Sequence, residues 1–141
     1  MVRRRDGRRR YPRGGDLVRI LVDTNALLWV LADSSDLDSV RRDLLTDPGN
    51  EVWVSAISLA EIAVKASIGK LPEPPTALAH VADRLGFRNL PFTEDHAARL
   101  GTLPLIHRDP FDRMLIAQAL VEDLTIMTSD RQFAAYGVAL T

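Results

Sequence analysis

The chain has 141 residues, of which 46% are hydrophobic, and this size predicts one compact domain with a single core. It has no cysteine, which excludes a disulfide framework, a thiolate nucleophile and a cysteine-based zinc site and is typical of proteins of the reducing cytoplasm. The formal net charge is −1, and no apolar run reaches the ~18 residues of a membrane span, so we expect a soluble protein that does not enter a membrane.

The first 17 residues differ in charge from the rest of the chain. Residues 1–17 contain seven Arg and two Asp, about +5, whereas the remainder contains 11 basic and 17 acidic residues. Gly and Pro are frequent and apolar residues are few, so we expect a disordered basic tail ahead of a folded domain at 18–141. The tail either attaches to nucleic acid or another anionic surface, or is a dispensable arm. We favour the dispensable arm, because a shorter chain could begin at Val18, just ahead of the first strand.

Apolar patterns predict strands and helices in alternation along the domain. The predicted strands are 20–22, 51–58, 86–92, 124–130 and 138–140, and the predicted helices are 25–32, 37–46, 59–69, 76–85, 93–100, 108–123 and one or two turns at 131–136. Pro48 and Gly49 end the second helix, and Thr93 is expected to cap the fifth. This alternation predicts an α/β fold with three layers, α/β/α, in which helices cover both faces of a mostly parallel central sheet.

Four acidic residues are predicted to lie near one edge of that sheet. Asp23 directly follows the strand in "ILVDTN", and Asp130 follows "LTIMTS". Glu61 is predicted in the first turn of the helix after the second strand, and Asp112 in the first turn of the long late helix. In open α/β sheets, ligands bind beyond the carboxyl ends of the strands. Two carboxylates ~4 Å apart repel by a few kcal/mol at an effective dielectric of 20. Clustering four acids therefore predicts a hard divalent cation, Mg²⁺ or Mn²⁺.

Each acid also has an ordinary structural explanation. The segment "SLAE" at 58–61 fits a capping box, and its glutamate stands four residues before Lys65, a favourable helical pair. The segment "DPFD" at 109–112 fits an N-cap, a proline at the first helical position and an acid at the third. Asp130 could cap the short helix that follows it. Taken singly these explanations are favoured, whereas the four acids taken together favour a metal site.

Four motifs then resemble, in order and spacing, those of the PIN domain, and specifically of the VapC-type toxin ribonucleases of bacterial toxin–antitoxin pairs. They are "LVDTNALLWVL", "ISLAEIAVKASIGKL", "HRDPFDRMLIAQA" and "TSDRQFAAYGV", and the resemblance covers nearly everything from Ile20 onward. It implies that Asp23, Glu61, Asp112 and Asp130 form an acidic Mg²⁺ site, held mainly by Asp23 and Asp112, at which a metal-activated water hydrolyses RNA phosphodiester bonds. It also implies a small antitoxin protein that covers the active-site groove, and a homodimer.

Several other residues have two interpretations. Thr24, Asn25 and Thr128 either fix the orientation of the carboxylates or make ordinary turn hydrogen bonds. The three histidines share no metal-binding spacing and are predicted to be solvated surface residues: His80, His96 and His107. Basic residues near the acids either contact RNA phosphates or pair with the acids: Lys65, Lys70, Arg108 and Arg113. Aromatic residues within apolar runs are predicted to pack rather than to stack on bases: Trp29, Trp53 and Phe111.

Two rival functions belong to other classes. A Mg²⁺-dependent phosphoryl-transfer enzyme of the haloacid-dehalogenase type needs a second Asp two positions after the first, where this chain has Asn25, and a receiver domain needs an acidic pair ahead of it. A catalytically silent PIN-like module that binds RNA or protein would be marked by a missing acid. All four acids are present, so the sequence favours the nuclease.

Overall fold

The structure is a computed structural model that describes residues 17–71, 78 and 80–141. Apart from Leu17, the basic segment lies outside the described residues, as does part of the helix expected at 76–85.

Four strands form one parallel sheet in the order β3-β2-β1-β4. They are β1 (Arg19–Val22), β2 (Glu51–Ser55), β3 (Arg88–Leu90) and β4 (Thr125–Met127). Strand β1 pairs with β2 on one side and with β4 on the other, so that Ile20 lies between Val52 and Thr125. A strand flanked on both edges and covered on both faces is expected to be continuously apolar, which explains "ILV".

The helices follow the predicted order with shifted boundaries. They are α1 (Thr24–Leu31), α2 (Ser39–Thr46), α3 (Ala56–Ser67), α4 (Val81–Leu85), α5 (Glu94–Thr102), α6 (Pro110–Glu122) and the 3₁₀ helix η1 (Arg131–Tyr136). Thr93 caps α5 as predicted, since its side chain accepts a hydrogen bond from the amide of His96.

Four predicted strands are longer than the strands of the structure. Those expected at 86–92 and 124–130 extend only over Arg88–Leu90 and Thr125–Met127. The strand expected at 51–58 ends at Ser55, because the Ser55 hydroxyl accepts a hydrogen bond from the Ile57 amide and begins α3 three residues earlier than predicted. The strand expected at 138–140 is only an isolated bridge, in which Leu140 pairs with Ile126. Gly137, with φ of +79°, turns the chain just before it.

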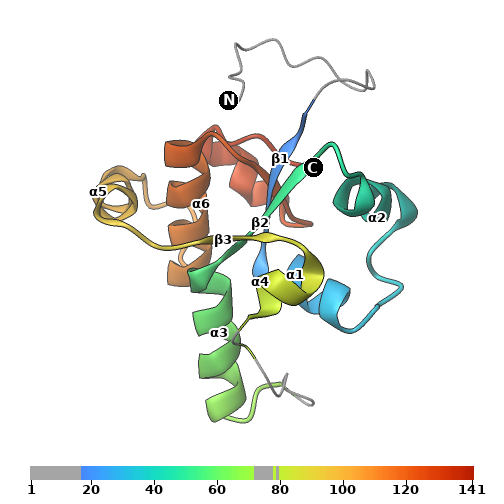
Figure 1. The fold of residues 1–141 in the computed structure, drawn as a ribbon. Coiled ribbons are helices and arrows are strands. Elements are labelled where there is room, and N and C mark those ends of the chain that lie inside the picture. The colour runs from blue at the N-terminus through green and yellow to red at the C-terminus, as the bar shows by residue number, and fades with distance from the viewer. Residues whose placement is uncertain (1–16, 72–77, 79) are drawn as a thin grey trace.

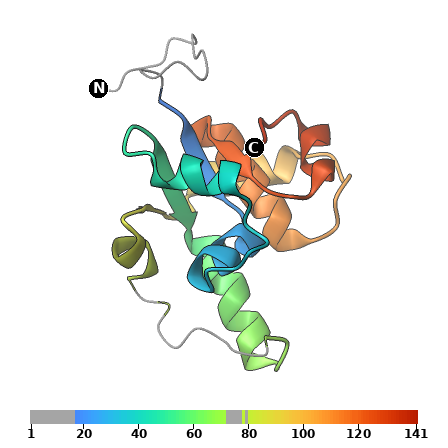
Figure 2. The same cartoon turned by 90° about the vertical axis from the view of Figure 1, so that its right-hand side faces the viewer.

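Alternate residues of β1 build two separate cores. Leu21 packs in a cluster with residues of α6, β4 and η1, such as Ile116 and Phe133. Ile20 and Val22 point to the opposite face, in a cluster with Leu27 of α1 and residues of α3 and α4. Figures 1 and 2 show the result, with α5 and α6 on one side of the sheet and α1 and α2 on the other. The predicted three-layer α/β/α fold is confirmed.

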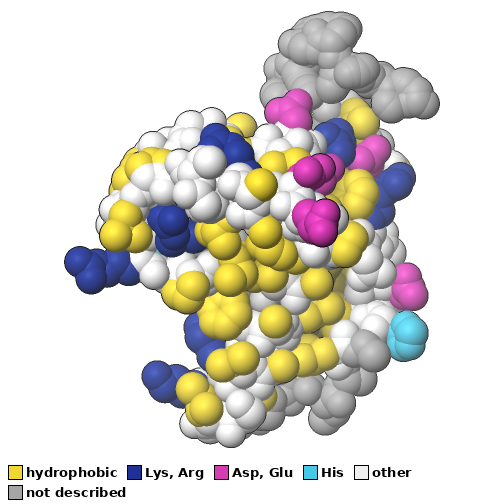
Figure 3. Space-filling view, turned by 90° about the vertical axis from the view of Figure 1, so that its left-hand side faces the viewer, with side chains coloured by type: hydrophobic (Ala, Val, Ile, Leu, Met, Phe, Trp, Pro, Cys, Tyr) yellow, Lys and Arg dark blue, Asp and Glu magenta, His cyan; other side chains and the backbone are white. Residues whose placement is uncertain are grey.

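Hydrophobic side chains gather on one face of the molecule, the left-hand side of Figure 1. Figure 3 views this face and shows the apolar surface at its centre, with basic side chains along one border. Large apolar side chains are exposed on α3, at Val64 and Ile68, and before α6, at Leu105 and Ile106. In the part of the chain that the structure describes, no helix has the length and hydropathy needed to cross a membrane.

Candidate functional site

Asp23 leaves the end of β1 and caps the next helix. Its Oδ1 accepts a hydrogen bond of 2.7 Å from the Ala26 amide, and its backbone amide continues the ladder to Met127 with a bond of 3.1 Å. The residue is only 7% exposed, and this burial raises the pKa of its carboxyl group, against the opposing effect of hydrogen bonds from Thr128 and Ala26. Capping accounts for the position of Asp23, but the cost of burying its charge remains.

Glu61 lies in the second turn of α3, not in the first turn as predicted, because the helix begins at Ala56. It is 4% exposed; its Oε1 accepts a 2.6 Å hydrogen bond from the Thr24 hydroxyl, and its Oε2 lies 2.9 Å from Lys65 Nζ. The helical pair with Lys65 is confirmed, and the hydrogen bond with Glu61 is the main cause that raises the pKa of that lysine. The capping-box interpretation is wrong, because α3 begins at Ala56 and Ser58 therefore lies inside the helix.

Asp112 occupies the first turn of α6, as predicted. Asp109 is the N-cap, its Oδ1 accepting from the amides of Phe111 and Asp112, and Pro110 is the first helical residue. Burial raises the pKa of the Asp112 carboxyl to about 7, with further contributions from the charges of Asp109, Glu61 and Asp23. Among the described residues, its only polar side-chain contact is His107, whose Nε2 lies 3.3 Å from Asp112 Oδ2. The ionised form of Asp112 is therefore destabilised by burial and by neighbouring acids, and the charge of His107 offsets this only in part.

Asp130 approaches the same place from the end of β4. Its Oδ1 caps η1 by accepting a hydrogen bond from the Gln132 amide, as predicted, and its Oδ2 lies 2.9 Å from His107 Nε2. The hydrogen bond with His107 is the main cause that lowers the pKa of this carboxyl group. Asp130 is thus joined to Asp112 through one imidazole.

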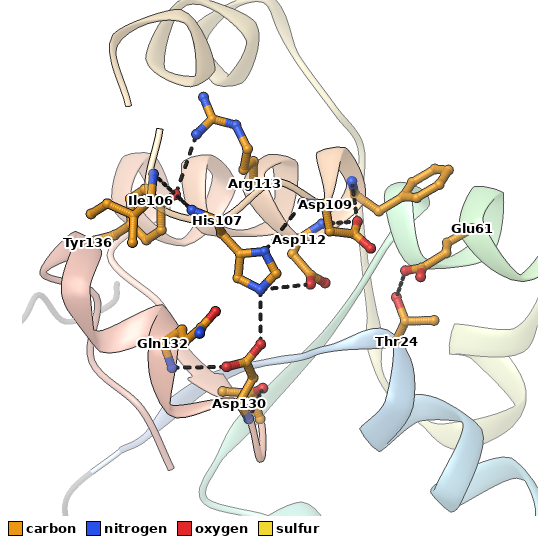
Figure 4. A network of polar contacts seen from close by, with 12 residues as sticks. Thr24, Glu61, Ile106, His107, Asp109, Asp112, Arg113, Asp130, Gln132 and Tyr136 are labelled. Carbon is orange, nitrogen blue, oxygen red and sulfur yellow. Dashed lines mark hydrogen bonds and ion pairs between the residues drawn. The ribbon is translucent and has the colours of Figure 1, made fainter. Parts of the chain in front are cut away.

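His107 is the largest departure from the sequence-based expectation. It was expected at the solvated surface, yet its side chain is 14% exposed and reaches both Asp112 and Asp130 (Figure 4). Ligand-type atoms of these three residues all lie within 4.8 Å of one another. The expectation is also wrong for His96, which is fully buried and lies 2.7 Å from Glu122 Oε2, whereas His80 is exposed as predicted.

Some of the polar residues next to the acids make hydrogen bonds at the site, and others do not. Thr24 and Thr128 are buried, and Thr128 Oγ1 also accepts a hydrogen bond from the Asp130 amide. Asn25 is exposed, and its side chain makes no hydrogen bond within the described chain. Arg113 does not pair with Asp109; it donates to the carbonyl of Pro104.

Arg41 of α2 is a residue near the site that the sequence did not reveal. Its Nη2 donates to the Thr128 carbonyl at 2.9 Å, and its charge helps to lower the pKa of Asp23. The hydrogen bond to Thr128 joins residues 87 positions apart in the sequence, so no local motif marks it.

Of the three aromatic residues, Trp29 and Trp53 pack against the two cores as predicted, and Phe111 is half-buried. Arg88 lies over the Trp53 ring at 5.6 Å.

The acids suit a hard divalent cation. The charge of Glu61 contributes to the raised pKa of both Asp23 and Asp112, and the charge of Asp23 contributes to that of Asp112. Asp130 is linked to Asp112 through His107 (Figure 4). Carboxylate oxygens are the ligands that Mg²⁺ and Mn²⁺ prefer. A cation would stabilise the ionised form of Asp112, the carboxyl group whose pKa is raised to about 7.

The fold is similar to those of several solved structures of toxins and toxin–antitoxin complexes. The structure of VapBC2 from Rickettsia felis, bound to promoter DNA, matches with a TM-score of 0.64 and 17% identity, over 88% of this chain and 98% of that one. FitAcB from Neisseria gonorrhoeae matches with a TM-score of 0.61 and 25% identity, over 86% and 95%. VapC20 from Mycobacterium tuberculosis, described as a toxin that cleaves the sarcin-ricin loop, matches with a TM-score of 0.57 and 19% identity, over 85% and 96%.

Comparison of the sequence gives the family directly. No curated protein matches the chain. The family model of the PIN domain matches residues 20–139, which include all four acids. The chain therefore belongs to the PIN domain family.

Proposed function

We propose that this protein is a divalent-metal-dependent endoribonuclease that acts as the toxin of a type II toxin–antitoxin pair. The observation that carries the proposal is that, in a PIN fold, Asp23 and Glu61 lie near enough to Asp112 for their charges to raise its pKa, while His107 links Asp112 to Asp130. The similar structures of toxin–antitoxin complexes, and of a toxin that cleaves an RNA loop, support it.

Asp23 and Asp112 would be the main ligands of the cation, Mg²⁺ or in its place Mn²⁺, and Glu61 and Asp130 would complete the site directly or through water. Asp23 and Glu61 are held by helix capping, by Thr24 and by Lys65, so their oxygens are fixed before a ligand arrives. A bound divalent cation would acidify a coordinated water and offset the charge of the scissile phosphate. Lys65, whose side chain is 41% exposed, supplies a positive charge next to the acids that can contact RNA phosphates.

The antitoxin partner is proposed to cover the groove at the acidic site. An apolar groove on the side of α1 and α2, which none of the four acids lines, is proposed as a second surface for the same partner. The groove has a volume of about 610 Å³ and lies between α1, α2, β2 and α4, and its apolar lining is Val30, Leu37, Leu45, Val52, Leu85 and Phe87. Arg42 and Asp47 provide charges at the same groove. An amphipathic segment of a partner that orders on binding fits such a surface. The apolar face in Figure 3 is proposed to be the homodimer surface.

A cleavage assay and a growth assay test the proposal with one matched pair of variants. Purified protein is incubated with total RNA in Mg²⁺ or in chelator, and cleavage is expected only with Mg²⁺. Asp112→Asn should abolish cleavage and relieve growth arrest on expression. The control, Asp123→Asn, alters an exposed residue with φ of +57°, a conformation that asparagine tolerates, and should behave as the parent. Full toxicity of folded Asp112→Asn protein would contradict the nuclease and favour a binding module.

A further inference from the structure

The ring of His107 is held in one orientation by three groups. Its backbone amide donates to the Tyr136 hydroxyl at 2.6 Å, and its ring packs edge-on against Phe133 at 5.7 Å with an interplanar angle of 81°. Its Nδ1 accepts a hydrogen bond of 3.3 Å from the Asp109 amide. Tyr136 and Phe133 belong to η1, the helix that Asp130 caps, so the ring and Asp130 are fixed to the same element (Figure 4).

The Asp109 amide decides which ring nitrogen carries the proton. A neutral imidazole has one donor and one acceptor nitrogen, and a backbone N–H can only donate. Because Nδ1 faces that N–H, Nδ1 must be the acceptor and Nε2 must carry the hydrogen. Nε2 is the atom that lies 2.9 Å from Asp130 Oδ2 and 3.3 Å from Asp112 Oδ2, so it donates toward two carboxylates.

We propose that His107 is a positioning residue that holds Asp130, and more weakly Asp112, in the orientation the acidic site requires, and that it does not itself bind the cation. This inference rests on the proposed metal site. Ligation through Nε2 would move the ring proton to Nδ1, where it would meet the Asp109 N–H. Asp130 already has Oδ1 engaged by the Gln132 amide, so the bond from His107 to Oδ2 fixes the second oxygen while each oxygen retains a lone pair for a ligand.

The tautomer is tested first in metal-free protein, which makes the result independent of the nuclease proposal. The full chain is labelled with ¹⁵N-histidine, and the ring nitrogens of His107 are assigned by comparison with His107→Gln. We expect a protonated Nε2 and an unprotonated Nδ1 near pH 8. An unprotonated Nε2 in the folded protein would overturn the proposal.

Mn²⁺ affinity, measured by calorimetry, then separates positioning from ligation. His107→Phe keeps a ring against Phe133 but removes the donor, and should weaken Mn²⁺ binding roughly tenfold. His107→Gln retains an N–H donor at a similar place and should restore most of the loss. His107→Phe should have no further effect in an Asp130→Ala background, and the exposed control His80→Phe should bind as the parent does.

Electron spin-echo spectroscopy of bound Mn²⁺ detects directly whether His107 is a ligand of the cation. Coupling of Mn²⁺ to a ¹⁵N-labelled imidazole that disappears in His107→Gln would show direct ligation and overturn the positioning role. The positioning role would also be overturned if the effects of His107→Phe and Asp130→Ala on Mn²⁺ affinity were fully additive. If the parent binds no Mn²⁺, the proposed metal site fails, and the tautomer alone decides whether His107 donates to Asp130.

Discussion

The Thr24 hydroxyl lies 2.6 Å from Glu61 Oε1 and joins the first turn of α1 to the middle of α3. Both residues are buried, and Ser58 adds a second hydroxyl, 3.1 Å from that of Thr24. Because an ionised carboxylate can only accept, the Thr24 hydroxyl donates to Glu61, and the Ser58 hydroxyl is free to donate to Thr24. The residue after Asp23 therefore orients the second acid of the site, which couples the end of β1 to α3.

This contact predicts that Thr24→Val impairs both stability and activity. Valine keeps the shape of threonine but leaves Glu61 Oε1 buried without its donor, so we expect a loss of about 1–3 kcal/mol in unfolding free energy and weaker metal-dependent RNA cleavage. Chemical denaturation and the cleavage assay measure the two effects. Thr24→Ser retains the hydroxyl and should keep both near parental values; an unchanged Thr24→Val protein would show that Glu61 does not need this bond.

Metal binding predicts a thermal shift that depends on the acids. A ligand that binds only the folded state at 100 times its Kd stabilises it by ~2.7 kcal/mol, so saturating Mg²⁺ or Mn²⁺ should raise the Tm. Asp23→Asn and Asp112→Asn should remove most of this shift and raise the Tm of the metal-free protein, since each relieves the cost of a buried charge. An equal metal-induced shift in both variants would place the cation elsewhere.

The raised pKa of Asp112 predicts how metal-free stability depends on pH. The ordinary value is 3.8 and the folded value is about 7, so between these pH values the folded state binds a proton that the unfolded state has released. The contribution of Asp112 to the free energy of unfolding is therefore greatest at low pH, and it falls as the pH rises from about 4 to about 7. After allowance for solvent screening, the fall is of the order of 1 kcal/mol.

The measurement is the stability difference between the parent and Asp112→Asn in chelator. The parent should lose stability relative to the variant as the pH rises through this window, whereas its difference from Asp123→Asn should stay nearly constant. If the stability difference between the parent and Asp112→Asn did not change from pH 4 to pH 8, the pKa of the Asp112 carboxyl group would not be raised in the folded protein.

Local patterns in the sequence account for much of the fold and for the acids. The run "ILV" predicts β1 because a central parallel strand is apolar on both faces, and "DPFD" predicts the start of α6 because its cap, proline and acid act within four residues. The closeness of Asp23 to Asp112 was predictable because each is an acid in an apolar pattern next to a strand or helix end.

Residues whose role depends on distant partners were not predictable. His96 is buried because α5 packs on α6, where Glu122 lies 26 positions away, and His107 meets Asp130 only after η1 folds against the loop before α6. The early start of α3 was missed because the cap residue, Ser55, also ends a strand. Such contacts come from tertiary packing between distant segments, which the hydrophobic periodicity of the sequence does not predict.

Lys65 yields a last prediction in which two measurements should move in opposite directions. Its Nζ lies 2.9 Å from Glu61 Oε2, and the charges of Asp109 and Asp112 also help to raise its pKa, so it partly neutralises the acids in the absence of a cation. Lys65→Met should therefore bind Mn²⁺ two- to fivefold more tightly, about 0.5–1 kcal/mol, because the competing positive charge is gone. It should nevertheless cleave RNA more slowly, because a phosphate contact is lost. Lys70→Met, an exposed change just after the same helix, should alter neither. Weaker Mn²⁺ binding by Lys65→Met would show instead that the lysine orients Glu61 for the cation rather than competing with it.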